Sequence, residues 1–572
     1  MKKNIIIVVS LFMLIACNST EKIPDTNYIV RAADLFETEA PKAALKSLPF
    51  TRGVNFSEWF ESYGAEGIAF TKYSEQDFAD VKSLGVDVIR LPIRMNSMTG
   101  SGPEYKINPM LLRFLDKAVD WAEKYEIYII IDNHSFDPAK DTANDIDKIL
   151  LPVWAQMAQH FSKRGDYVLY EVLNEPHGIS DGRWGEIQGM AIGEIRKYDT
   201  KHAIVVGGGD FNSIAKLQKI PKYNDTNLIY TFHFYDPFMF THQGAGWSPP
   251  LEYLANVPFP YNAARMPKLH NKLRGTWVES NLGNDYKKES DAAYMRKTLD
   301  RAVEFSNERD VPVFCGEFGV YDLVSPAADR ALWYEVVTDM LSRRNISRTS
   351  WDYFGAFGIF KKGGKDFNRD LNVDVAWAMG FTPPEQLPRN EAPLEKGFII
   401  YDDYPSREYS LGCWGDGIIF SLYDTGAYNS EFCIRWGNVN RYNSLWVLLY
   451  ESRNFSKLAA SGFAVQFYAR TETALSFDVR FVNPETSDSI PWRIRYTIDE
   501  KILPPDGKWH KIRIPLDKMT EQGAWLNSEQ KWLQPQGKFS WDNVHQLEFV
   551  SEHHDLKNKF VCFDDIKITN VE

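Results

Sequence analysis

The sequence predicts an α/β protein: a (β/α)8 TIM barrel over residues 49–380, followed by an all-β jelly-roll sandwich domain over residues 397–572. Three observations support this prediction. Eight short β-branched runs alternate with stretches of helical periodicity, a proline-rich linker follows at residues 381–396, and helical periodicity is absent beyond it. A chain of 572 residues is also long enough for two folded units with flanking segments.

The first 17 residues have the pattern of a signal peptide. Two lysines precede an apolar stretch, residues 5–16, that is too short to span a membrane. The stretch ends in Leu-Ile-Ala followed by Cys17, which resembles the bacterial lipobox. We therefore expect Cys17 to be lipidated and to hold a lipoprotein at the cell envelope, on the outer membrane. Secretion with cleavage elsewhere is the alternative. Residues 18–48 are polar and indicate a tether with one short helix near residues 40–48.

Strands and helices alternate through the barrel region. The eight predicted strands are Gly53–Phe56, Asp87–Leu91, Ile127–Asp132, Val168–Leu173, Ala203–Gly207, Leu228–Phe232, Val311–Cys315 and Arg348–Trp351. The helical stretches between them include Met110–Lys124, Trp154–Ser162, Ile187–Tyr198, Ala292–Asn307 and Ala327–Arg344. A closed parallel barrel requires eight strand–helix units, so we favour it over an open sheet.

The largest insertion follows the sixth predicted strand, from Asp236 to about Lys288. It is rich in proline and aromatic residues, and a long loop on the catalytic face of a barrel is usually functional. An elaborated loop that packs only on itself is the alternative.

The region after the linker has the pattern of an antiparallel β-domain. Its predicted strands include Gly462–Tyr468, Leu475–Phe481, Trp492–Ile498 and Val561–Ile568. A jelly-roll sandwich is the simplest closure for such a set. Cys413 and Cys433 can form a disulfide in an oxidising compartment, with free thiols as the favoured alternative, and Cys315 is expected to be a buried free thiol.

Polar and aromatic residues gather at the carboxyl ends of the predicted barrel strands. These ends and the loops after them converge on one face of a parallel barrel. In chain order the residues are Arg90, Asn133, His134, Asn174, Glu175, His233, Tyr235, Glu317 and Trp351. Four further acidic residues near strand ends are expected to be structural or supporting: Glu58, Asp132, Glu171 and Asp210.

Glu175 and Glu317 are the pair of carboxylates that glycoside hydrolysis requires. A glycosidic bond breaks through an oxocarbenium-like transition state, so one carboxylic acid must protonate the leaving oxygen while a carboxylate stabilises the anomeric carbon. His233 is a candidate hydrogen-bond partner for Glu175, and Arg90 and Tyr235 are candidate donors to Glu317. A structural ion pair with Arg90 is the alternative for either glutamate.

The strand-end motifs resemble those of a known family. The segments Arg90-Leu91-Pro92, Asp132-Asn133-His134, Leu173-Asn174-Glu175-Pro176, His233-Phe234-Tyr235, Gly316-Glu317-Phe318-Gly319 and Ser350-Trp351 are similar to the successive motifs of glycoside hydrolase family 5, the cellulase-like family. The resemblance spans roughly residues 50–380. It implies a retaining double displacement with Glu175 as acid/base and Glu317 as nucleophile. It also implies that Arg90, His134, Asn174, His233, Tyr235 and Trp351 bind substrate, and we add Trp59 as a further substrate-binding candidate.

One position departs from the family pattern, and the second domain adds a further resemblance. Phe211 follows the fifth strand where many family members carry Trp, so one sugar platform is expected to be altered. The end of the second domain is similar to the jelly-roll carbohydrate-binding modules attached to such enzymes. Its candidates for stacking on sugar rings are Trp414, Tyr428, Trp436 and Trp446, and core packing is the alternative for each.

The predicted function is a retaining endo-β-1,4-glucanase that acts on a β-linked polysaccharide or oligosaccharide. The alternatives are a related mannanase, xyloglucanase or exo-β-glucanase, or a non-catalytic surface glycan-binding lipoprotein, against which the intact glutamate pair argues. We expect no cofactor and no metal, because His134 and His233 stand apart and not as His-x-His. A net charge of −12 argues against nucleic-acid binding. We expect membrane contact only through the lipid anchor, and a monomer.

Overall fold

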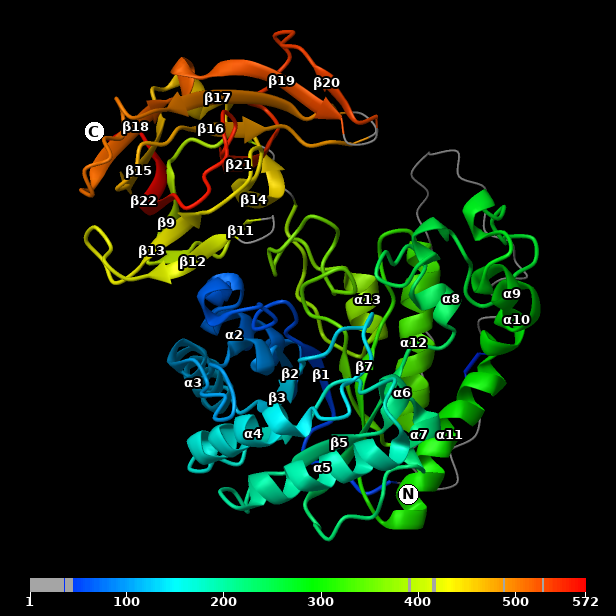
Figure 1. Cartoon of the computed structure of the whole chain (residues 1–572). Helices are drawn as coiled ribbons and strands as arrows, with labels where there is room; N and C mark the ends of the chain where they lie inside the picture. Colours follow the sequence, from blue (N-terminus) through cyan, green and yellow to red (C-terminus); the bar gives the residue numbers. More distant parts are fainter. Residues whose placement is uncertain are drawn as a thin grey trace, which may run out of the picture.

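The computed structural model contains a closed eight-stranded barrel and a sandwich of two antiparallel sheets (Figure 1). It describes residues 35–36, 45–388, 392–413, 418–486, 489–526 and 529–571. The predicted signal peptide, Cys17, Trp414 and most of the tether lie outside these ranges, and residues 45–48 are not helical. In the part of the chain that the structure describes, no helix is both long enough and apolar enough to cross a bilayer.

The barrel strands run in parallel in the order β1 to β8, and β8 pairs with β1 to close the ring. They are β1 (Arg52–Asn55), β2 (Val88–Ile93), β3 (Tyr128–Asn133), β4 (Val168–Glu171), β5 (Ile204–Gly207), β6 (Leu228–Phe234), β7 (Val313–Phe318) and β8 (Ser347–Ser350). All eight predicted strands are confirmed, with ends that differ by a few residues at most. Most are buried along their whole length, because helices cover the outside and side chains fill the inside.

Helices surround the barrel. They are α2 (Glu75–Ser83), α3 (Pro109–Lys124), α4 (Asp147–Phe161), α5 (Asp181–Arg196), α6 (Gly209–Asn212), α7 (Ile214–Leu217), α8 (Phe238–Thr241), α9 (Trp277–Asn284), α10 (Tyr286–Glu289), α11 (Ala292–Arg309), α12 (Ala327–Arg343) and α13 (Val373–Ala378), with 3-10 turns η1 (Ala65–Gly67), η2 (Phe70–Lys72), η3 (Met95–Met98), η4 (Leu251–Tyr253) and η5 (Asn271–Leu273). The five predicted helices correspond to α3, α4, α5, α11 and α12. Helices α4 and α5 begin earlier than predicted; at α5 the side chain of Ser180 caps the first turn by accepting from Arg183 N.

The local sequence of α3 accounts for its bounds and its packing. Asn108 caps the helix by accepting a hydrogen bond from Met110 N at 2.9 Å, and Pro109 occupies the first helical position, where no backbone donor is needed. Its buried residues recur at helical spacing: Leu111, Phe114, Leu115, Ala118, Val119 and Ala122. This stripe packs the helix onto the barrel.

The inside of the barrel is layered. One apolar cluster fills its amino-terminal end and consists of Phe50, Val88, Ile130, Leu169, Val205, Ile229 and Phe314. Side chains two positions along a strand share a face, so the next inward layer holds Arg90, Asp132 and Glu171. The alternation therefore places a charged layer directly above an apolar plug, at the end where the strands finish.

The second domain is a sandwich of two seven-stranded antiparallel sheets. One sheet contains β9 (Phe398–Asp402), β10 (Tyr404–Pro405), β12 (Ile419–Asp424), β13 (Cys433–Gly437), β15 (Ala464–Arg470), β18 (His510–Pro515) and β22 (Phe560–Thr569). The other contains β11 (Tyr409–Cys413), β14 (Ser444–Arg453), β16 (Phe477–Val482), β17 (Trp492–Ile498), β19 (Thr520–Leu526), β20 (Lys531–Leu533) and β21 (Val544–Val550). The segments α14 (Ser456–Ala460) and η6 (Leu516–Lys518) complete the domain. The sheets pack through aromatic residues, with the rings of Phe549 and Phe563 4.5 Å apart. The predicted all-β domain and its four strands are confirmed.

The structure decides two alternatives that the sequence left open in this domain. Cys413 and Cys433 are free thiols, the favoured alternative, and β11 and β13 lie in different sheets. Trp436 is not a sugar platform, because its side chain is fully buried near Phe563. Cys315 is a buried free thiol as expected.

The sandwich docks against the barrel through β10, β12 and the turn between β12 and β13 (Figure 1). The Tyr423 hydroxyl donates to Ile68 O and accepts from Phe70 N at 3.2 Å. A ladder of rings continues the contact, with centroids 4.3 Å apart for Phe70 and Phe114 and 5.1 Å apart for Phe114 and Tyr423. We call this ladder, which also includes Trp59, Trp121 and Tyr404, the aromatic bridge.

The docking site lies at the catalytic rim of the barrel. The turns η1 and η2 follow β1, and Lys365 follows β8, so both contacts come from loops that leave the carboxyl ends of strands. Lys365 Nζ donates to Lys72 O and, at 3.0 Å, to Arg407 O of the sandwich. Part of the proline-rich segment also lies on the barrel, where Gln386 Oε1 accepts from Leu371 N at 2.7 Å.

Candidate active site

Arg90 is the centre of the charged layer at the carboxyl end of the barrel. Its side chain is fully buried, and its Nε and Nη2 donate to the two carboxylate oxygens of Glu171 at 2.7 and 2.8 Å. Nη2 also donates to Asn174 Oδ1 at 2.7 Å and lies 3.0 Å from Asp132 Oδ2. Burial alone would lower the pKa of Arg90, but the surrounding carboxylates raise it well above its usual value. A permanent cation is therefore fixed under the pocket.

Glu317 receives two donors from opposite sides. Arg90 Nη1 donates to Oε1 at 2.8 Å, and the Tyr235 hydroxyl donates to Oε2 at 2.8 Å. A β-bulge between β6 and β7 places Glu317 directly beside His233. A side chain at Gly316 would come within 2.7 Å of Thr231 Oγ1, so glycine is required where the bulge brings the strands together.

Glu175 follows β4 in a left-handed backbone conformation, with φ of 45°. Such a conformation is unfavourable for a non-glycine residue and is found most often where function requires it. Nδ1 of His233 donates to Glu175 Oε1 at 2.7 Å, and the other ring nitrogen lies 3.4 Å from Asn212 Nδ2, which donates to it. Burial lowers the pKa of His233 to about 4, so the ring is neutral and this donor pattern is consistent.

The two glutamates lie close together in different environments. A carboxylate oxygen of each, together with a ring nitrogen of His233, lies within 4.8 Å of the others. Burial raises the pKa of Glu175 to about 7. Glu317 instead has a guanidinium and a hydroxyl pointed at it. One carboxyl is thus set up to be protonated near neutral pH, while the other accepts two hydrogen bonds from fixed donors.

His134, Asn174 and Trp351 line the next part of the pocket. His134 Nδ1 lies 2.7 Å from Asp132 Oδ2, and Nδ2 of Asn174 donates to the other ring nitrogen at 3.3 Å. The rings of His134 and Trp351 are stacked with centroids 5.4 Å apart, and Trp351 remains partly exposed. The structure therefore brings six of the seven predicted substrate-binding residues to one pocket with both glutamates.

Trp59 is the seventh, and the prediction that it binds substrate is wrong. Its side chain is 1% exposed, and its ring nitrogen donates to the backbone oxygen of Phe70 at 2.7 Å. It stacks on Trp121 within the aromatic bridge. An aromatic residue four positions after a strand fits the barrel wall as well as it fits the pocket, and sequence position alone does not separate these cases.

Several supporting residues were missed or undervalued in the sequence. Asn55 at the end of β1 accepts from Arg90 Nη1 at 3.0 Å and donates to Gly316 O at 3.1 Å. Asn212 after β5 fixes the His233 ring. Glu171, expected to be structural, is the main carboxylate partner of Arg90. The signal in the sequence that could have identified these residues was a polar side chain at or shortly after the end of a strand.

The insertion after β6 forms a wall beside the pocket. His242 packs edge-on against Tyr235 with centroids 4.9 Å apart, and Trp247 packs edge-on against Tyr321 at 4.9 Å. Trp247 is 47% exposed. Phe211, expected to alter a platform, stacks on His177 at 4.1 Å and is 40% exposed. Exposed rings at the rim suit the apolar faces of sugars.

The donor set of the pocket does not favour a metal ion. Glu175, His233 and Glu317 offer ligand atoms within 4.8 Å of one another. However, Arg90 and Tyr235 direct hydrogen-bond donors at Glu317, and the Nδ1 proton of His233 is directed at Glu175. A cation at this point would replace these donors and face a buried guanidinium.

Comparison with known proteins agrees with this geometry. The family model described as cellulase, glycosyl hydrolase family 5, matches residues 49–356. Endoglucanase 3 of Fibrobacter succinogenes is 32% identical over 339 residues, which are 54% of this chain and 50% of that protein. Endoglucanase C of Acetivibrio thermocellus is 27% identical over 342 residues, 56% of this chain and 96% of that protein. Endoglucanase H of the same organism is 23% identical over 530 residues, 86% of this chain and 51% of that protein.

The chain spans about half the length of Endoglucanase 3 and of Endoglucanase H. The region matched by the family model is more than half of the chain and contains the whole strand series from β1 to β8. It also contains both glutamates and every residue of the pocket described above. The chain therefore belongs to the cellulase family, glycosyl hydrolase family 5.

Proposed function

We propose that the chain is a retaining endo-β-1,4-glucanase with Glu175 as acid/base and Glu317 as nucleophile. The observation that carries this proposal is the proximity of the two carboxylates, whose nearest ligand oxygens lie within 4.8 Å of each other. Retaining glycosidases hold their carboxyl groups about 5–5.5 Å apart, whereas inverting enzymes leave about 6.5–9.5 Å for a water molecule. The curated relatives named above are endoglucanases, which supports a β-glucan substrate.

The geometry supports a two-step mechanism. In the first step Glu317 attacks the anomeric carbon while Glu175 gives its proton to the departing glycosidic oxygen. Arg90 and Tyr235 hold the attacking carboxylate in place. In the second step Glu175, now ionised, removes a proton from water, which displaces Glu317 and restores the original anomeric configuration. Asn174, fixed by Arg90, presents its amide next to the reacting carbon.

Two glutamate variants test these roles. Glu317→Ala is expected to lower kcat/KM on carboxymethyl-cellulose by at least about 10³-fold, because no covalent intermediate can form. Glu175→Ala is expected to keep kcat/KM on an aryl cellobioside, whose leaving group needs no proton, but to lose kcat because the second step lacks its base. Azide, a nucleophile that needs no base, is expected to restore kcat in place of water. Glu304→Ala, an exposed residue on α11, is the matched control. Equal activity of Glu317→Ala and Glu304→Ala would remove Glu317 from the mechanism.

A substrate panel tests the glycan. Carboxymethyl-cellulose, mixed-linkage glucan, xyloglucan and mannan are each incubated with the full chain, and reducing ends and viscosity are followed together. An endo-glucanase is expected to lower viscosity early relative to the sugar released. Faster action on mannan or xyloglucan would assign the chain to one of these related activities, and sugar release without early loss of viscosity would indicate exo action. Release from none would leave only glycan binding.

We propose that the sandwich supplies a second glycan-binding site, in a groove that crosses one of its sheets. The groove has a volume of about 840 Å³ and is lined by Tyr442, Ser444, Arg480, Arg493, Trp525, Trp532, Glu548 and Glu552. Trp525 and Trp532 are directly opposite each other on β19 and β20, and the Arg493 guanidinium lies 5.6 Å from the Trp532 ring centre. Of the residues suggested by the sequence, the three that the structure describes, Tyr428, Trp436 and Trp446, are not among its lining residues.

The polar groups of this groove match the chemistry of sugar hydroxyls. Arg480 pairs with Glu548 and, at 3.1 Å, with Glu552, so charges of both signs line the floor. The Nε of Arg493 is a buried donor that has no hydrogen-bond partner among the described residues, and burial lowers the pKa of Arg493 to about 10. A buried donor without a partner is unfavourable, and a bound hydroxyl would satisfy it.

We further propose that the chain is exported, lipidated at Cys17, held at the cell envelope and monomeric. The proposal rests on the two lysines, the short apolar stretch and the lipobox-like tetrapeptide. In a bacterial host, labelled palmitate is expected to enter the full chain but not the Cys17→Ser variant. Label in both would exclude Cys17 as the lipidated residue.

A further inference from the structure

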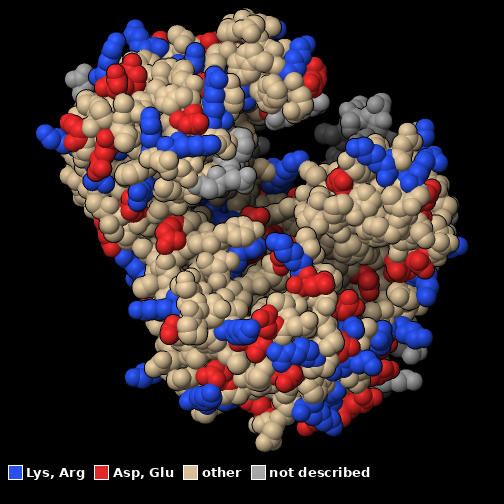
Figure 2. All heavy atoms as spheres, viewed as in Figure 1, with Lys and Arg blue, Asp and Glu red and all other residues tan. Residues whose placement is uncertain are grey.

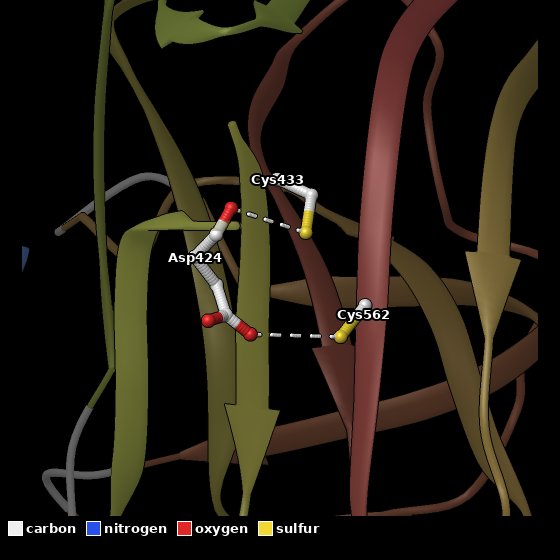
Figure 3. A group of neighbouring side chains, drawn as sticks. All are labelled: Asp424, Cys433 and Cys562. Atoms are coloured by element: carbon white, nitrogen blue, oxygen red, sulfur yellow. Dashed lines mark hydrogen bonds between the residues drawn. The ribbon is translucent and has the colours of Figure 1, made fainter. Parts of the chain in front are cut away.

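Cys433 and Cys562 are neighbours on the sheet that faces the barrel. Cys433 begins β13 and Cys562 lies on β22, and these two strands are hydrogen-bonded with Arg435 opposite Cys562. Figure 3 shows both sulfur atoms hydrogen-bonded to Asp424. The two sulfur atoms and a carboxylate oxygen of Asp424 all lie within 4.8 Å of one another. Both thiols are at most 1% exposed. Two close thiols in one cluster distinguish this pair from Cys315 and Cys413.

Charges of both signs lie at the cluster: two guanidiniums, and the Asp424 carboxylate, whose Oδ2 accepts from Cys562 Sγ at 4.0 Å. Arg470 Nη2 lies 3.8 Å from Cys562 Sγ, and Arg435 Nε lies 3.9 Å from Asp424 Oδ2. Cys433 Sγ donates to Asp424 O at 3.5 Å. The neighbouring Cys433 and the Arg470 guanidinium lower the pKa of Cys562 to about 7, while Cys562 raises the pKa of Cys433.

These charges decide between two uses of the cluster. Asp424 and two thiolates could hold a thiophilic metal ion, but two guanidiniums already lie within 4 Å of the ligand atoms and would repel it. The Arg470 guanidinium favours a thiolate at Cys562, and a thiolate is the attacking species in thiol–disulfide exchange. The surroundings therefore favour covalent chemistry at sulfur over cation binding.

We propose that Cys433 and Cys562 are a disulfide-forming pair that fastens the β12–β13 hairpin to β22. The Cys562 thiolate attacks an external disulfide and displaces one of its sulfurs as a thiolate, which leaves a mixed disulfide on Cys562. Cys433 then loses its proton, attacks the Cys562 sulfur and displaces the second external thiolate. The two cysteines are oxidised by two electrons, and the external disulfide is reduced to two thiols.

The cross-link would act where the two domains meet. Strand β12 is the edge of its sheet, and the hairpin carries Tyr423 and Glu431, which contact the barrel. The segment between β12 and β13 is held in place, since Tyr428 N donates to Asp564 Oδ2 at 2.7 Å and Gly426 O accepts from the Trp509 ring nitrogen at 3.3 Å. Because both thiols are buried, exchange requires a local opening of the domain, or it takes place during folding.

The test is thiol mapping of the full chain. The protein is refolded with glutathione disulfide or with reduced glutathione, denatured, alkylated and digested, and its peptides are identified by mass spectrometry. We expect a linked Cys433–Cys562 peptide only after oxidation, with Cys315 and Cys413 alkylated in both samples. We expect the oxidised chain to melt at least about 5 °C higher, because the cross-link closes a long loop in the unfolded chain.

Variants and a metal control complete the test. Cys433→Ser and Cys562→Ser should each lose the oxidation-dependent rise in Tm, while the control Cys413→Ser should keep it. If Cys562→Ser fails to fold, Cys433→Ser alone decides the point. Alkylation of both cysteines after refolding with glutathione disulfide would overturn the proposal. Protection of both thiols by Zn²⁺, reversed by a chelator and without a linked peptide, would also overturn it and assign the cluster to metal.

Discussion

The barrel pocket and the sandwich groove use similar residues in different states. Arg90 in the barrel is fully buried, and acceptors surround its guanidinium. Arg493 in the groove is partly buried, and its Nε has no partner in the part of the chain that the structure describes. A catalytic site needs its groups fixed before substrate arrives, because reorganisation would cost activation energy. A binding groove gains affinity from groups that the ligand itself completes. This difference between Arg90 and Arg493 indicates that the barrel pocket is the site of catalysis and that the groove is a binding site.

The largest expected effect is at Arg90. Arg90→Leu should lower the free energy of unfolding by about 3–5 kcal/mol, because Asp132, Glu171 and Glu317 would remain as buried carboxylates without their counter-charge. It should also lower kcat/KM by at least about 10³-fold. Urea unfolding and kinetics measure the two losses. Arg480→Leu in the groove is the matched control and should leave kcat/KM on a soluble aryl cellobioside unchanged. An equal loss of activity in both variants would contradict the contrast.

The next largest expected effect is the pH dependence of kcat/KM at the barrel pocket. Glu175 must be protonated to act as an acid, and burial raises its pKa to about 7. We therefore expect kcat/KM on carboxymethyl-cellulose to be high below this pH and to fall as pH rises through it. Binding to the groove should be unaffected across the same range.

A variant identifies the group that titrates. In Glu175→Ala, with an aryl cellobioside as substrate, the loss of kcat/KM above pH 7 should disappear. Burial also raises the pKa values of Asp132 and Asp352 to about 7. If kcat/KM of Glu175→Ala still falls above pH 7, the group that titrates is therefore one of these two carboxyls.

A smaller effect is expected in the groove. Trp525→Ala should weaken binding of the full chain to β-glucan about tenfold, through loss of one stacking surface worth about 1.4 kcal/mol. The kcat on a soluble aryl cellobioside should not change. Affinity electrophoresis in gels containing glucan measures the first, and Trp377→Ala, an exposed tryptophan of the barrel, is the control. Unaltered mobility of Trp525→Ala would remove the groove as the binding site.

The smallest effect is expected at the exposed ion pair between the domains. Arg113 and Glu431 form two hydrogen bonds of 2.6 and 2.9 Å, but their side chains are 45% and 54% exposed. Solvent screens such a pair, so Glu431→Gln should change Tm by less than about 2 °C. Tyr423→Ala, which removes a ring of the buried aromatic bridge, should lower Tm more in the same calorimetric experiment. The reverse order would show that charge, and not ring packing, joins the domains.

The barrel could be predicted well because two of its features are visible in the sequence: the alternation of strands with helices, and the polar residues at strand ends. Eight apolar runs located the strands, and polar residues at their ends located Glu175, His233 and Glu317. Figure 2 shows that Lys, Arg, Asp and Glu are scattered over the viewed face of the molecule. Trp59 was misassigned because a tryptophan after a strand fits core and pocket equally. The groove was missed because Trp525 and Trp532 belong to separate strands, and only strand pairing brings them together.

The aromatic bridge has a consequence for how such enzymes are cut and recombined. Phe70 and Phe114 belong to the barrel but pack against Tyr404 and Tyr423 of the sandwich. A fragment that stops after the last barrel helix would therefore expose a patch of stacked rings, which favours self-association. Domain boundaries drawn at the proline-rich segment divide one packed unit. Joining this catalytic domain to a different second domain would therefore require polar residues in place of the exposed rings of the aromatic bridge.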